Sequence, residues 1–385
     1  MATIQLKGIT WGHSRGYTPL GAFSQRFSEL HPDVEITWKQ RTLQEFADFP
    51  IEKLTERYDL LIIDHPWVGC ADATRCVLPL DEHLSEAYLD DQAQNSVGNS
   101  HRSYQYGGHQ WGLAIDAATP VASYRADLFE QHQAEVPTTW DALLELASRG
   151  NVAVPAIPID LLMNFYMFCL AHGKTPFSSE EEVIDAETGL QVLDTMGDLY
   201  GRVDKTFFSR NPIAVAEVMT RTDDYWYCPF AYGYSNYSRT GYAAQLLTYG
   251  DLVDFRPGEK LRSTLGGTGL AVSAFSAHPE WAVRFAEAIV SGPCQSTFYV
   301  EHGGQPGHRA AWTSESANQL THQFFRSTLP ALDRAFTRPR YNGYLHFQDH
   351  AGDPLHRYLK EGGSPERVLQ EINQLYRESR KNAKA

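Results

Sequence analysis

Apolar and polar positions along the first third of the chain follow two periodicities, which predict strands and helices in turn. Residues 4–11 and 34–38 fit strands. Residues 20–30 carry apolar side chains at helical spacing, and residues 51–57 fit a short helix. Strands that alternate with helices are joined by right-handed crossovers into a parallel sheet. The pattern therefore predicts an α/β unit at the start of the chain.

A run of four apolar residues, 60–63, ends abruptly in Asp64, His65, Pro66 and Trp67. Such a run is typical of a strand buried on both faces of a parallel sheet. Pro66 has no N–H to give to a neighbouring strand, so the strand should end before it. Because ligands bind beyond the carboxyl ends of strands in open α/β sheets, we expect a binding loop at residues 64–67.

A second α/β unit is expected to begin near residue 111. Residues 111–116 and 121–124 fit strands, and a helix begins after Thr138 with Asp141 as its capping-box acid. Residues 225–242 are unusually aromatic and are interrupted by glycine and proline. The other predicted elements are a strand at 152–157, helices at 159–172 and 189–200, a glycine turn into a strand at 266–272, and helices at 279–290 and over most of 311–385.

Length and composition place the chain among soluble globular proteins. At 385 residues it is too long for one simple core, so two or three domains are expected. A hydrophobic fraction of 42% and a charged fraction of 21% are ordinary for this class. A net charge of -14 argues against nucleic acid and against an anionic membrane surface as partners. No run approaches the ~20 apolar residues of a membrane span.

The cysteines and the N-terminal segment indicate in which cellular compartment the protein works. Five cysteines are an odd number and are widely spread, so we expect incidental thiols, although Cys70 and Cys76 are near enough in sequence to pair. The chain runs from Met1 directly into a strand, without the basic segment, apolar core and cleavage site of a secretory signal. We therefore expect either that a signal was removed or that the protein never had one.

The order of motifs resembles family 1 of the extracellular solute-binding proteins of ABC importers, the class that includes maltose-binding protein. No single motif is diagnostic, but their collinear order covers nearly the whole chain. The motifs are WGH at 11–13, HPDV at 31–34, YDLLIIDH at 58–65, GLAIDAATPVASYRADLF at 112–129, PTTWDALLELA at 137–147, GGTGLAVS at 266–273, HPEWAVRFAEAI at 278–289 and GGQPGHRAAW at 303–312.

This resemblance implies a two-lobed periplasmic-binding-protein fold of the α/β class. Each lobe would be a mainly parallel sheet flanked by helices, with the ligand in a cleft between the lobes. Mapped onto this chain, lobe 1 comprises residues 1–115 and 267–310 and is discontinuous. Lobe 2 comprises residues 116–266, and a C-terminal helical segment, 311–385, would brace both lobes.

The loop after the first strand holds the first candidate ligand-binding residues, Trp11, His13, Arg15 and Tyr17. Tryptophan and tyrosine faces suit the partly apolar faces of sugar rings, while arginine offers a planar fork to a carboxylate or to hydroxyls. The plainer alternative is that Trp11 packs between lobes and Arg15 is solvated.

Asp64, His65 and Trp67 form the second candidate group, since a carboxylate and a neutral imidazole both bond sugar hydroxyls. The alternative for Asp64 is that it satisfies backbone N–H groups of its own turn. Asp116 follows the predicted crossing strand, where an Asx turn is equally plausible.

The remaining candidates come from the aromatic stretch and the glycine turn. Tyr232 and Asn236 would supply a wall from lobe 2, although part of that stretch must be core. Gly267 and Thr268 would bring backbone N–H groups to a ligand oxygen, because glycine has no side chain in the way. A hinge role explains these two residues equally well.

We identify no sequence motif for metal binding, for a serine nucleophile or for nucleotide binding. We predict no metal site and no cofactor, because we identify neither a His-x-x-x-His pair on a helix nor a cysteine pair at zinc spacing. We also find no Gly-x-Ser-x-Gly elbow, no P-loop and no dinucleotide-binding glycine motif.

We therefore predict a monomeric, non-catalytic binding protein that captures a carbohydrate or sugar acid by hinge closure. By resemblance it would deliver this ligand to the membrane permease of an ABC importer, outside the cytoplasm. If Met1 is the native start, we expect a cytoplasmic location instead. The alternatives are a cleft enzyme that uses Asp64 and His65 as an acid–base pair, and a cytoplasmic metabolite sensor.

Overall fold

The computed structural model describes residues 3–42 and 51–382, and the chain divides into two compact units. The first unit comprises Met1–Ala118, Gly266–Leu320 and Arg340–Asn342. The second comprises Thr119–Leu265, Thr321–Pro339 and Gly343–Ala385. The C-terminal segment, predicted to brace both lobes, is thus divided. Most of it belongs to the second unit.

The first unit is built on a five-stranded sheet in the order β2-β1-β3-β12-β6. Its strands are β1 (Ile4–Trp11), β2 (Val34–Arg41), β3 (Leu60–Ile63), β12 (Thr268–Val272) and β6 (Leu113–Asp116). Strand β1 is parallel to β2 and β3, whereas β12 is antiparallel to both β3 and β6. All four residues of β3 are buried, as the apolar run predicted.

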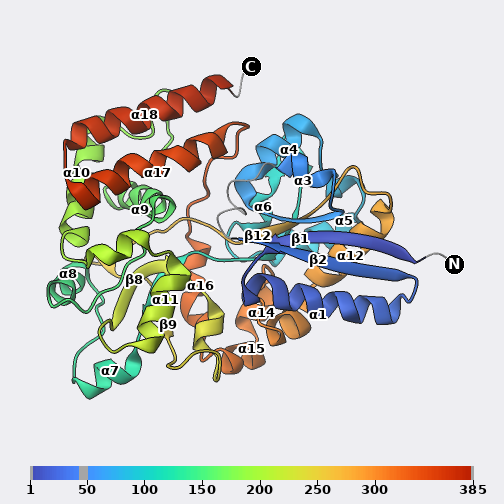
Figure 1. Ribbon diagram of the computed structural model, residues 1–385, viewed down its shortest axis with the longest axis horizontal. Helices are drawn as coiled ribbons and strands as arrows, with labels where there is room; N and C mark the ends of the chain where they lie inside the picture. Colours follow the sequence, from blue (N-terminus) through green and yellow to red (C-terminus); the bar gives the residue numbers. More distant parts are fainter. Residues whose placement is uncertain (1–2, 43–50, 383–385) are drawn as a thin grey trace. The chain divides into compact units, whose positions relative to one another are not determined.

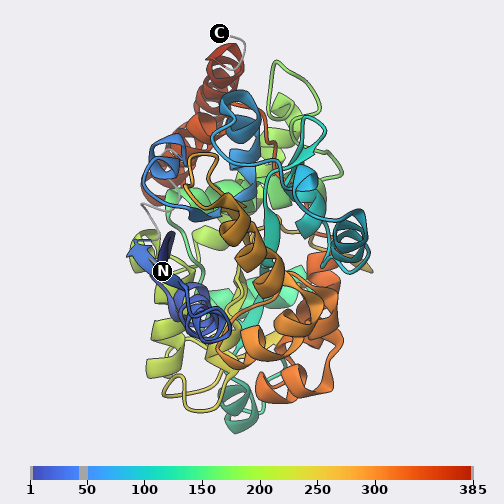
Figure 2. The same cartoon turned by 90° about the vertical axis from the view of Figure 1, so that its right-hand side faces the viewer.

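Helices cover both faces of this sheet (Figure 1). Helix α1 (Ser14–Leu30) and helix α12 (Pro279–Val290) lie side by side on one face, where the rings of Phe23 and Phe285 are 5.6 Å apart (Figure 2). Helices α3 (Ile51–Thr55) and α4 (Val68–Thr74) lie on the other face.

Shorter elements complete the first unit. They are the 3-10 helices η1 (His65–Trp67) and η2 (Leu80–Glu82), helices α5 (Glu86–Gln94) and α6 (Ser100–Ser103), strands β4 (Gln105–Tyr106) and β5 (His109–Gln110), helix α13 (Gly292–Cys294), the π-helix η5 (Gln295–Tyr299), and helices α14 (Arg309–Thr313) and α15 (Glu315–Leu320).

The second unit contains a three-stranded sheet in the order β8-β7-β9, paired antiparallel throughout. The expectation of a mainly parallel sheet is therefore wrong for this unit. A long, largely helical segment, residues 125–226, separates β7 from β8, and both neighbours of β7 run antiparallel to it. The strands are β7 (Pro120–Tyr124), β8 (Tyr227–Tyr232) and β9 (Thr248–Gly250), with a separate hairpin of β10 (Asp254–Arg256) and β11 (Glu259–Lys260).

A predicted strand at 152–157 is absent from the structure. Only Val152 forms an isolated bridge, to Tyr227. Pro155 and Pro158 lack the N–H groups that a ladder needs, so this buried apolar run is irregular. The helix predicted after Thr138 is capped instead by Thr139, whose side chain accepts from the Ala142 N–H.

Helices make up most of the second unit. Helix α9 (Pro158–Ala171) is buried from Asp160 to Cys169, as expected for a helix that is apolar all round. Helix α17 (Tyr344–Glu361) packs on it, and α18 (Pro365–Asn382) lies along α17 (Figure 1). The other helices are α7 (Ala126–Gln131), α8 (Trp140–Ser148), α10 (Ala186–Tyr200), η3 (Lys205–Ser209), α11 (Pro212–Arg221), η4 (Ser235–Ser238) and α16 (Phe324–Asp333).

Two general properties bear on the expectations from sequence. Within the part of the chain that the structure describes, no helix is long and apolar enough to cross a membrane. All five cysteines are free thiols, so Cys70 and Cys76 are not joined.

Candidate functional site

The ends of four strands bring most of the predicted residues to one edge of the first unit's sheet. Strands β1, β3 and β6 end at this edge with Trp11, Ile63 and Asp116, and the antiparallel strand β12 begins there with Thr268. We call this the strand-end edge. It is where an open α/β sheet binds ligands.

The turn after β1 is tighter than the polar loop predicted from sequence. His13 caps α1, and its Nδ1 accepts a hydrogen bond from the Arg15 N–H at 3.0 Å. Helix α1 therefore begins at Ser14, and Arg15 and Tyr17 belong to its first turn. Gly16 allows this course, since a Cβ there would lie 2.3 Å from Nε1 of Trp11.

Trp11, His13 and Arg15 form a stack at this turn. The Trp11 and His13 rings lie 5.6 Å apart and are nearly parallel, with 11° between their planes. The Arg15 guanidinium carbon lies 5.5 Å from the centroid of the Trp11 ring. Trp11 is only 4% exposed, so its indole supports the turn and offers little surface to a ligand.

Arg15 forms a buried ion pair with Asp116. Its Nε donates to Asp116 Oδ2 at 2.8 Å, and its Nη2 donates to Asp116 Oδ1. Both side chains are almost inaccessible to solvent. Burial raises the pKa of Asp116, and the adjacent guanidinium opposes that rise. The positive charge of Arg15, which the sequence suggested could bind an anionic ligand, is thus compensated by Asp116 within the protein.

His13 is kept neutral at this turn. Burial, together with the nearby Arg15 cation, lowers the pKa of His13 from 6.5 to about 4. Because Nδ1 accepts from the Arg15 N–H, the neutral imidazole carries its proton on Nε2. His13 therefore presents a hydrogen-bond donor without a charge.

Acidification is expected to destabilise the fold through His13. Its pKa is lower in the folded chain than in the unfolded one, so its contribution is complete above pH 6.5 and is lost as the pH falls towards about 4. The shift corresponds to at most about 3 kcal/mol of unfolding free energy. Urea unfolding of the wild type and of His13→Asn between pH 4 and 7 measures this dependence.

The asparagine is chosen because its side-chain oxygen also caps helices well. We expect His13→Asn to keep the helix start and to show a shallower pH slope. Substitution of the exposed His83 by asparagine is the matched control and should leave the slope unchanged. If the His13→Asn slope equals that of the wild type, His13 is not the group responsible.

The loop after β3 turns out to be a capped 3-10 turn. Asp64 Oδ1 accepts from the His65 N–H at 2.8 Å and lies 3.3 Å from His65 Nδ1. The His65 side chain has no exposed surface, whereas that of Asp64 is 18% exposed. Trp67 is also buried. Of these three predicted residues, Asp64 is the one that reaches the surface.

Gly267 and Thr268 meet Asp116 directly. Thr268 pairs with Asp116 across the sheet. Gly267 has a φ of +90°, and a Cβ there would lie 2.4 Å from the Asp116 carbonyl oxygen. This close approach of two backbones explains the glycine without a ligand. It leaves the predicted ligand contact untested.

Three further predicted residues, Tyr17, Tyr232 and Asn236, stay predictions as ligand contacts. Tyr17 is half-buried on α1. Tyr232 and Asn236 belong to the second unit, where the Tyr232 hydroxyl is 3.3 Å from Thr264 Oγ1 and Asn236 is buried in η4.

Two residues at the strand-end edge were not predicted from sequence, and a third, Gln305, was expected mainly to form a turn. Buried Arg41 ends β2 and donates to the Ile62 carbonyl at 3.0 Å. The Tyr104 hydroxyl donates to the Ile63 carbonyl at 3.4 Å. Gln305 holds Ala117 through both its backbone carbonyl and its Nε2. Only Gln305 carried a local sequence signal, its place in the GGQPG turn. Arg41 and Tyr104 carried none, because their contacts are with segments distant in sequence.

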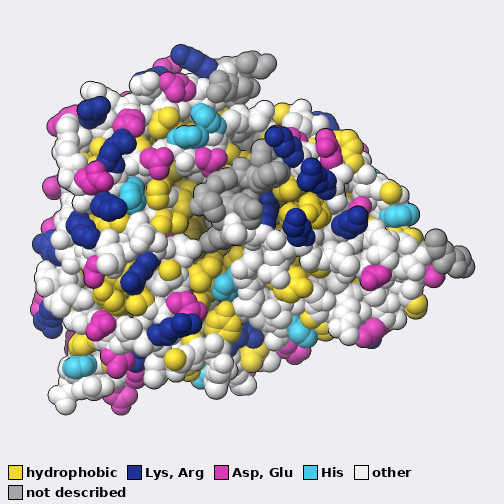
Figure 3. All heavy atoms as spheres, viewed as in Figure 1, with side chains coloured by type: hydrophobic (Ala, Val, Ile, Leu, Met, Phe, Trp, Pro, Cys, Tyr) yellow, Lys and Arg dark blue, Asp and Glu magenta, His cyan; other side chains and the backbone are white. Residues whose placement is uncertain are grey.

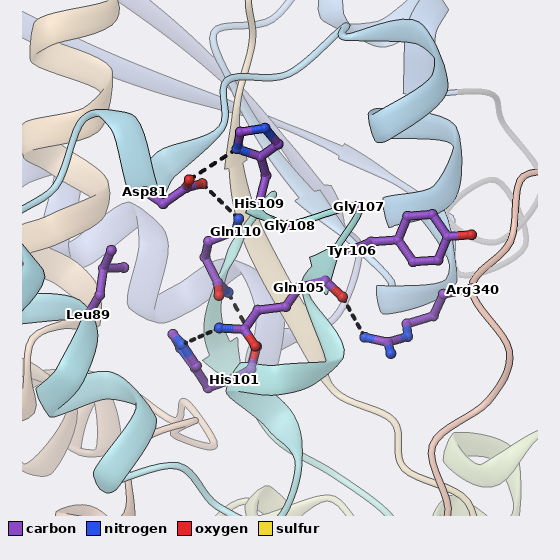
Figure 4. Close-up of a pocket in the computed structure, with 10 residues that line it drawn as sticks. All are labelled: Asp81, Leu89, His101, Gln105, Tyr106, Gly107, Gly108, His109, Gln110 and Arg340. Atoms are coloured by element: carbon purple, nitrogen blue, oxygen red, sulfur yellow. Dashed lines mark hydrogen bonds and ion pairs between the residues drawn. The ribbon is translucent and has the colours of Figure 1, made fainter.

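A separate cavity of about 530 Å³ lies beside the β4–β5 hairpin (Figure 4). The hairpin lies just before the first residue of β6, and Asp116 is the last residue of β6. The cavity and the strand-end edge therefore lie towards opposite ends of that strand. None of the predicted residues lines it. The lining residues are Asp81, Leu89, His101, Gln105, Tyr106, Gly107, Gly108, His109, Gln110 and Arg340.

The polar groups of this cavity are largely bonded to one another. Asp81 lies 3.0 Å from His109 Nδ1 and accepts from the Gln110 N–H at 2.8 Å. The Arg340 Nη1 donates to the carbonyl of Gln105 at 2.7 Å, as Figure 4 shows. We therefore place the candidate site at the strand-end edge.

Comparison with solved structures shows the fold. Maltose-bound MalE3 of T. maritima superposes with a TM-score of 0.85 at 17% identity, over 97% of this chain and 99% of that chain. A ribitol-bound ABC transporter solute-binding protein from Agrobacterium radiobacter K84 gives 0.82 at 18% identity, over 98% and 99%. The GacH receptor of Streptomyces glaucescens GLA.O, solved unliganded and with acarbose, gives 0.80 at 17% identity, over 99% and 100%. The fold is therefore the two-lobed fold of these binding proteins.

Comparison of sequences shows the family. The maltotriose-binding protein of Pyrococcus abyssi (strain GE5 / Orsay) is 26% identical over 128 residues, which is 33% of this chain. The match spans only 26% of that relative's length. The family model described as bacterial extracellular solute-binding protein matches residues 11–291, well over half of the sequence. This chain therefore belongs to the bacterial extracellular solute-binding protein family.

Proposed function

We propose that this protein captures a small neutral carbohydrate or polyol, leaves it chemically unchanged, and delivers it to an ABC importer. The observation that carries the proposal is the arrangement at the strand-end edge. There a neutral histidine donor, His13, and a partly exposed carboxylate, Asp64, stand at strand ends, and the buried Arg15 is already paired with Asp116. Hydroxyl groups match such a site because each both donates and accepts.

The ion pair between Arg15 and Asp116 favours a neutral ligand over a sugar acid. An anionic ligand would have to compete for Arg15 with a buried carboxylate that already binds it through two hydrogen bonds. Bidentate pairing of this kind is among the strongest in proteins. The ligand's carboxylate would gain little, and its own dehydration would oppose binding.

The names of similar proteins support the carbohydrate class. The solved structures were obtained with maltose, ribitol and acarbose, which are polyhydroxylated compounds. The matched relative is described as binding maltotriose. We infer a ligand of the same general chemistry here, without choosing among them.

The remaining parts of the proposal rest on the family. Capture would occur by closure of the two units on the ligand, which stabilises the closed state only by binding it more tightly than the open one. We propose that the protein acts as a monomer outside the cytoplasm and presents its ligand to a membrane permease, in keeping with the extracellular family it belongs to.

The structure offers little support to an acid–base role for Asp64 and His65. A general base must come within hydrogen-bond reach of the proton that it removes. His65 has no exposed surface and packs edge-on against Tyr104, with their ring centroids 6.4 Å apart. Binding without turnover is therefore the function that we propose.

A ligand panel tests this function directly. We expect neutral sugars and polyols, including maltose, maltotriose and ribitol, to raise the melting temperature, and gluconate and glucuronate to have little effect. A ligand at 100 times its Kd stabilises the folded state by about 2.7 kcal/mol. Mass spectrometry of the recovered ligand should show no chemical change.

Two tryptophan variants locate the site. Trp11→Phe should weaken binding of the ligand found in the panel, because it disturbs the Trp11–His13 stack at the strand-end edge. Trp281→Phe is the control, since Trp281 contacts Phe27 and His31 at the far end of α1, about 25 Å away along that helix. Equal losses in both variants, stabilisation by sugar acids alone, or conversion of the ligand would contradict the proposal.

A further inference from the structure

Two histidines lie side by side on the exposed face of α17. His346 and His350 are four residues apart on this helix, both are exposed, and their ring centroids are 4.6 Å apart with 47° between the planes. Figure 3 shows adjacent histidine side chains, with acidic ones beside them, where α17 begins. The prediction from sequence that no such helical pair exists was wrong.

The ring of His350 is held in one tautomer. Its Nδ1 lies 2.7 Å from the backbone carbonyl oxygen of His346. A carbonyl oxygen only accepts hydrogen bonds, so Nδ1 carries the proton and Nε2 keeps its lone pair. Metal-binding histidines commonly donate their second nitrogen to a carbonyl in this way, which orients the ring and raises the basicity of the ligating nitrogen.

The backbone between the two histidines is fixed by packing. Phe347 is buried against Phe177 and Tyr376, with ring centroids 5.8 Å and 5.7 Å away. Buried Gln348 accepts from Arg338 Nη1 at 2.7 Å. The helix is thus held from its inner face, while its outer face carries the two imidazoles. Little backbone freedom therefore remains to be lost when both rings bind one ion.

We propose that His346 and His350 form a two-imidazole site for a divalent transition-metal ion, with Cu²⁺ preferred. Two histidines at i and i+4 on one helix face share a metal ion in helical metal-binding motifs. For nitrogen ligands, affinity rises along the first-row divalent series to Cu²⁺ and falls again at Zn²⁺. Asp349 and Asp353 are exposed on the same helix and favour an approaching cation.

The open coordination sphere also favours copper over zinc. Structural zinc sites use four protein ligands. Among residues 3–42 and 51–382, no group of three or more His, Cys, Asp or Glu side chains is placed to hold a metal ion. A two-histidine site completes its coordination with water, which suits the tetragonal geometry of Cu²⁺. This site is independent of the proposed carbohydrate function, since α17 carries none of the predicted ligand residues.

Equilibrium dialysis of the tag-free full chain against CuCl₂ tests the site. We expect one tightly bound equivalent of Cu²⁺ in the wild type, with weaker binding of NiCl₂. His346→Ala and His350→Ala should each weaken binding of this equivalent by at least about tenfold, the loss that even an outer-shell partner causes. Far-ultraviolet circular dichroism checks that the variants stay folded, and His83→Ala is the exposed-histidine control.

The double variant separates chelation from independent binding. If both rings hold one ion, His346→Ala/His350→Ala should bind this equivalent little more weakly than either single variant. Losses that add up, or a tight equivalent that survives in the double variant, would overturn the proposal. A loss in His83→Ala equal to those at α17 would do the same.

Discussion

Arg15→Met is expected to lower the free energy of unfolding by about 3–5 kcal/mol at pH 7. Methionine keeps much of the packing volume but removes the cation, which leaves the buried Asp116 carboxylate without its partner. Removing one member of a buried pair is costly because the remaining charge is still dehydrated. Urea denaturation monitored by tryptophan fluorescence measures the change.

A second substitution distinguishes charge from packing. In the double variant Arg15→Met/Asp116→Leu no charge remains buried, so most of the lost stability should return. Arg26→Met is the matched surface control, because Arg26 pairs with Glu29 where both side chains are about half exposed, and exposed pairs contribute about 0–1 kcal/mol. A double variant as unstable as Arg15→Met would show that packing, not charge, dominates.

The same variant also informs ligand choice. If the role of Asp116 is only to neutralise Arg15, the folded fraction of Arg15→Met should still prefer neutral sugars. If Arg15 instead binds an anionic ligand directly, Arg15→Met would abolish stabilisation by sugar acids that the wild type binds. The ligand panel on the wild type decides which case applies before the variant is made.

Gly267→Ala is expected to cost about 2–4 kcal/mol. Two effects combine at this position. The φ of +90° is strained for any residue with a side chain, and the new Cβ would lie 2.4 Å and 2.7 Å from Asp116 O and Ala117 Cα, which are backbone atoms of the neighbouring segment. Since neither backbone atom can rotate away, the β12–β6 pairing must shift.

Gly258→Ala is a control that isolates the close approach. Gly258 has a similar φ, +77°, but a Cβ there meets nothing within 4 Å. Its cost should be only about 1 kcal/mol, the conformational part alone. Chemical denaturation of both variants gives the difference. Equal costs would mean that the contact with Asp116 is readily relieved and that the glycine is required only for its φ.

The elements with strong local signals were predicted well. The apolar run 60–63 is strand β3, the first strand is β1, and the helix at 279–290 is α12, each with the predicted ends. These segments combine clear periodicity with a sharp stop, and both features are local. The strand expected at 152–157 failed because apolar composition indicates burial but does not supply the N–H groups that two prolines remove.

The candidate site was predicted in part. Sequence reasoning found the strand ends that carry Trp11, Asp64 and Asp116, because residues that follow buried strands lie at a known edge of the sheet. It could not find Arg41 or Tyr104, which reach the same edge from segments distant in sequence. It missed His346 and His350 although their spacing is visible in the chain, so that omission was one of recognition.

Local pattern was enough to assign the α/β class, the family resemblance and the residues that end the strands of the first unit, since periodicity and chain order depend on neighbouring residues alone. The partners of those residues were decided by the folded chain. The sequence alone suggests that Arg15 is a free cation beside a tryptophan. In the folded chain it is buried against Asp116, 101 positions later. His65 reads as a binding residue, yet it has no exposed surface. Charge compensation and burial arise between segments far apart in sequence, so only the tertiary structure shows which polar groups remain available to a ligand.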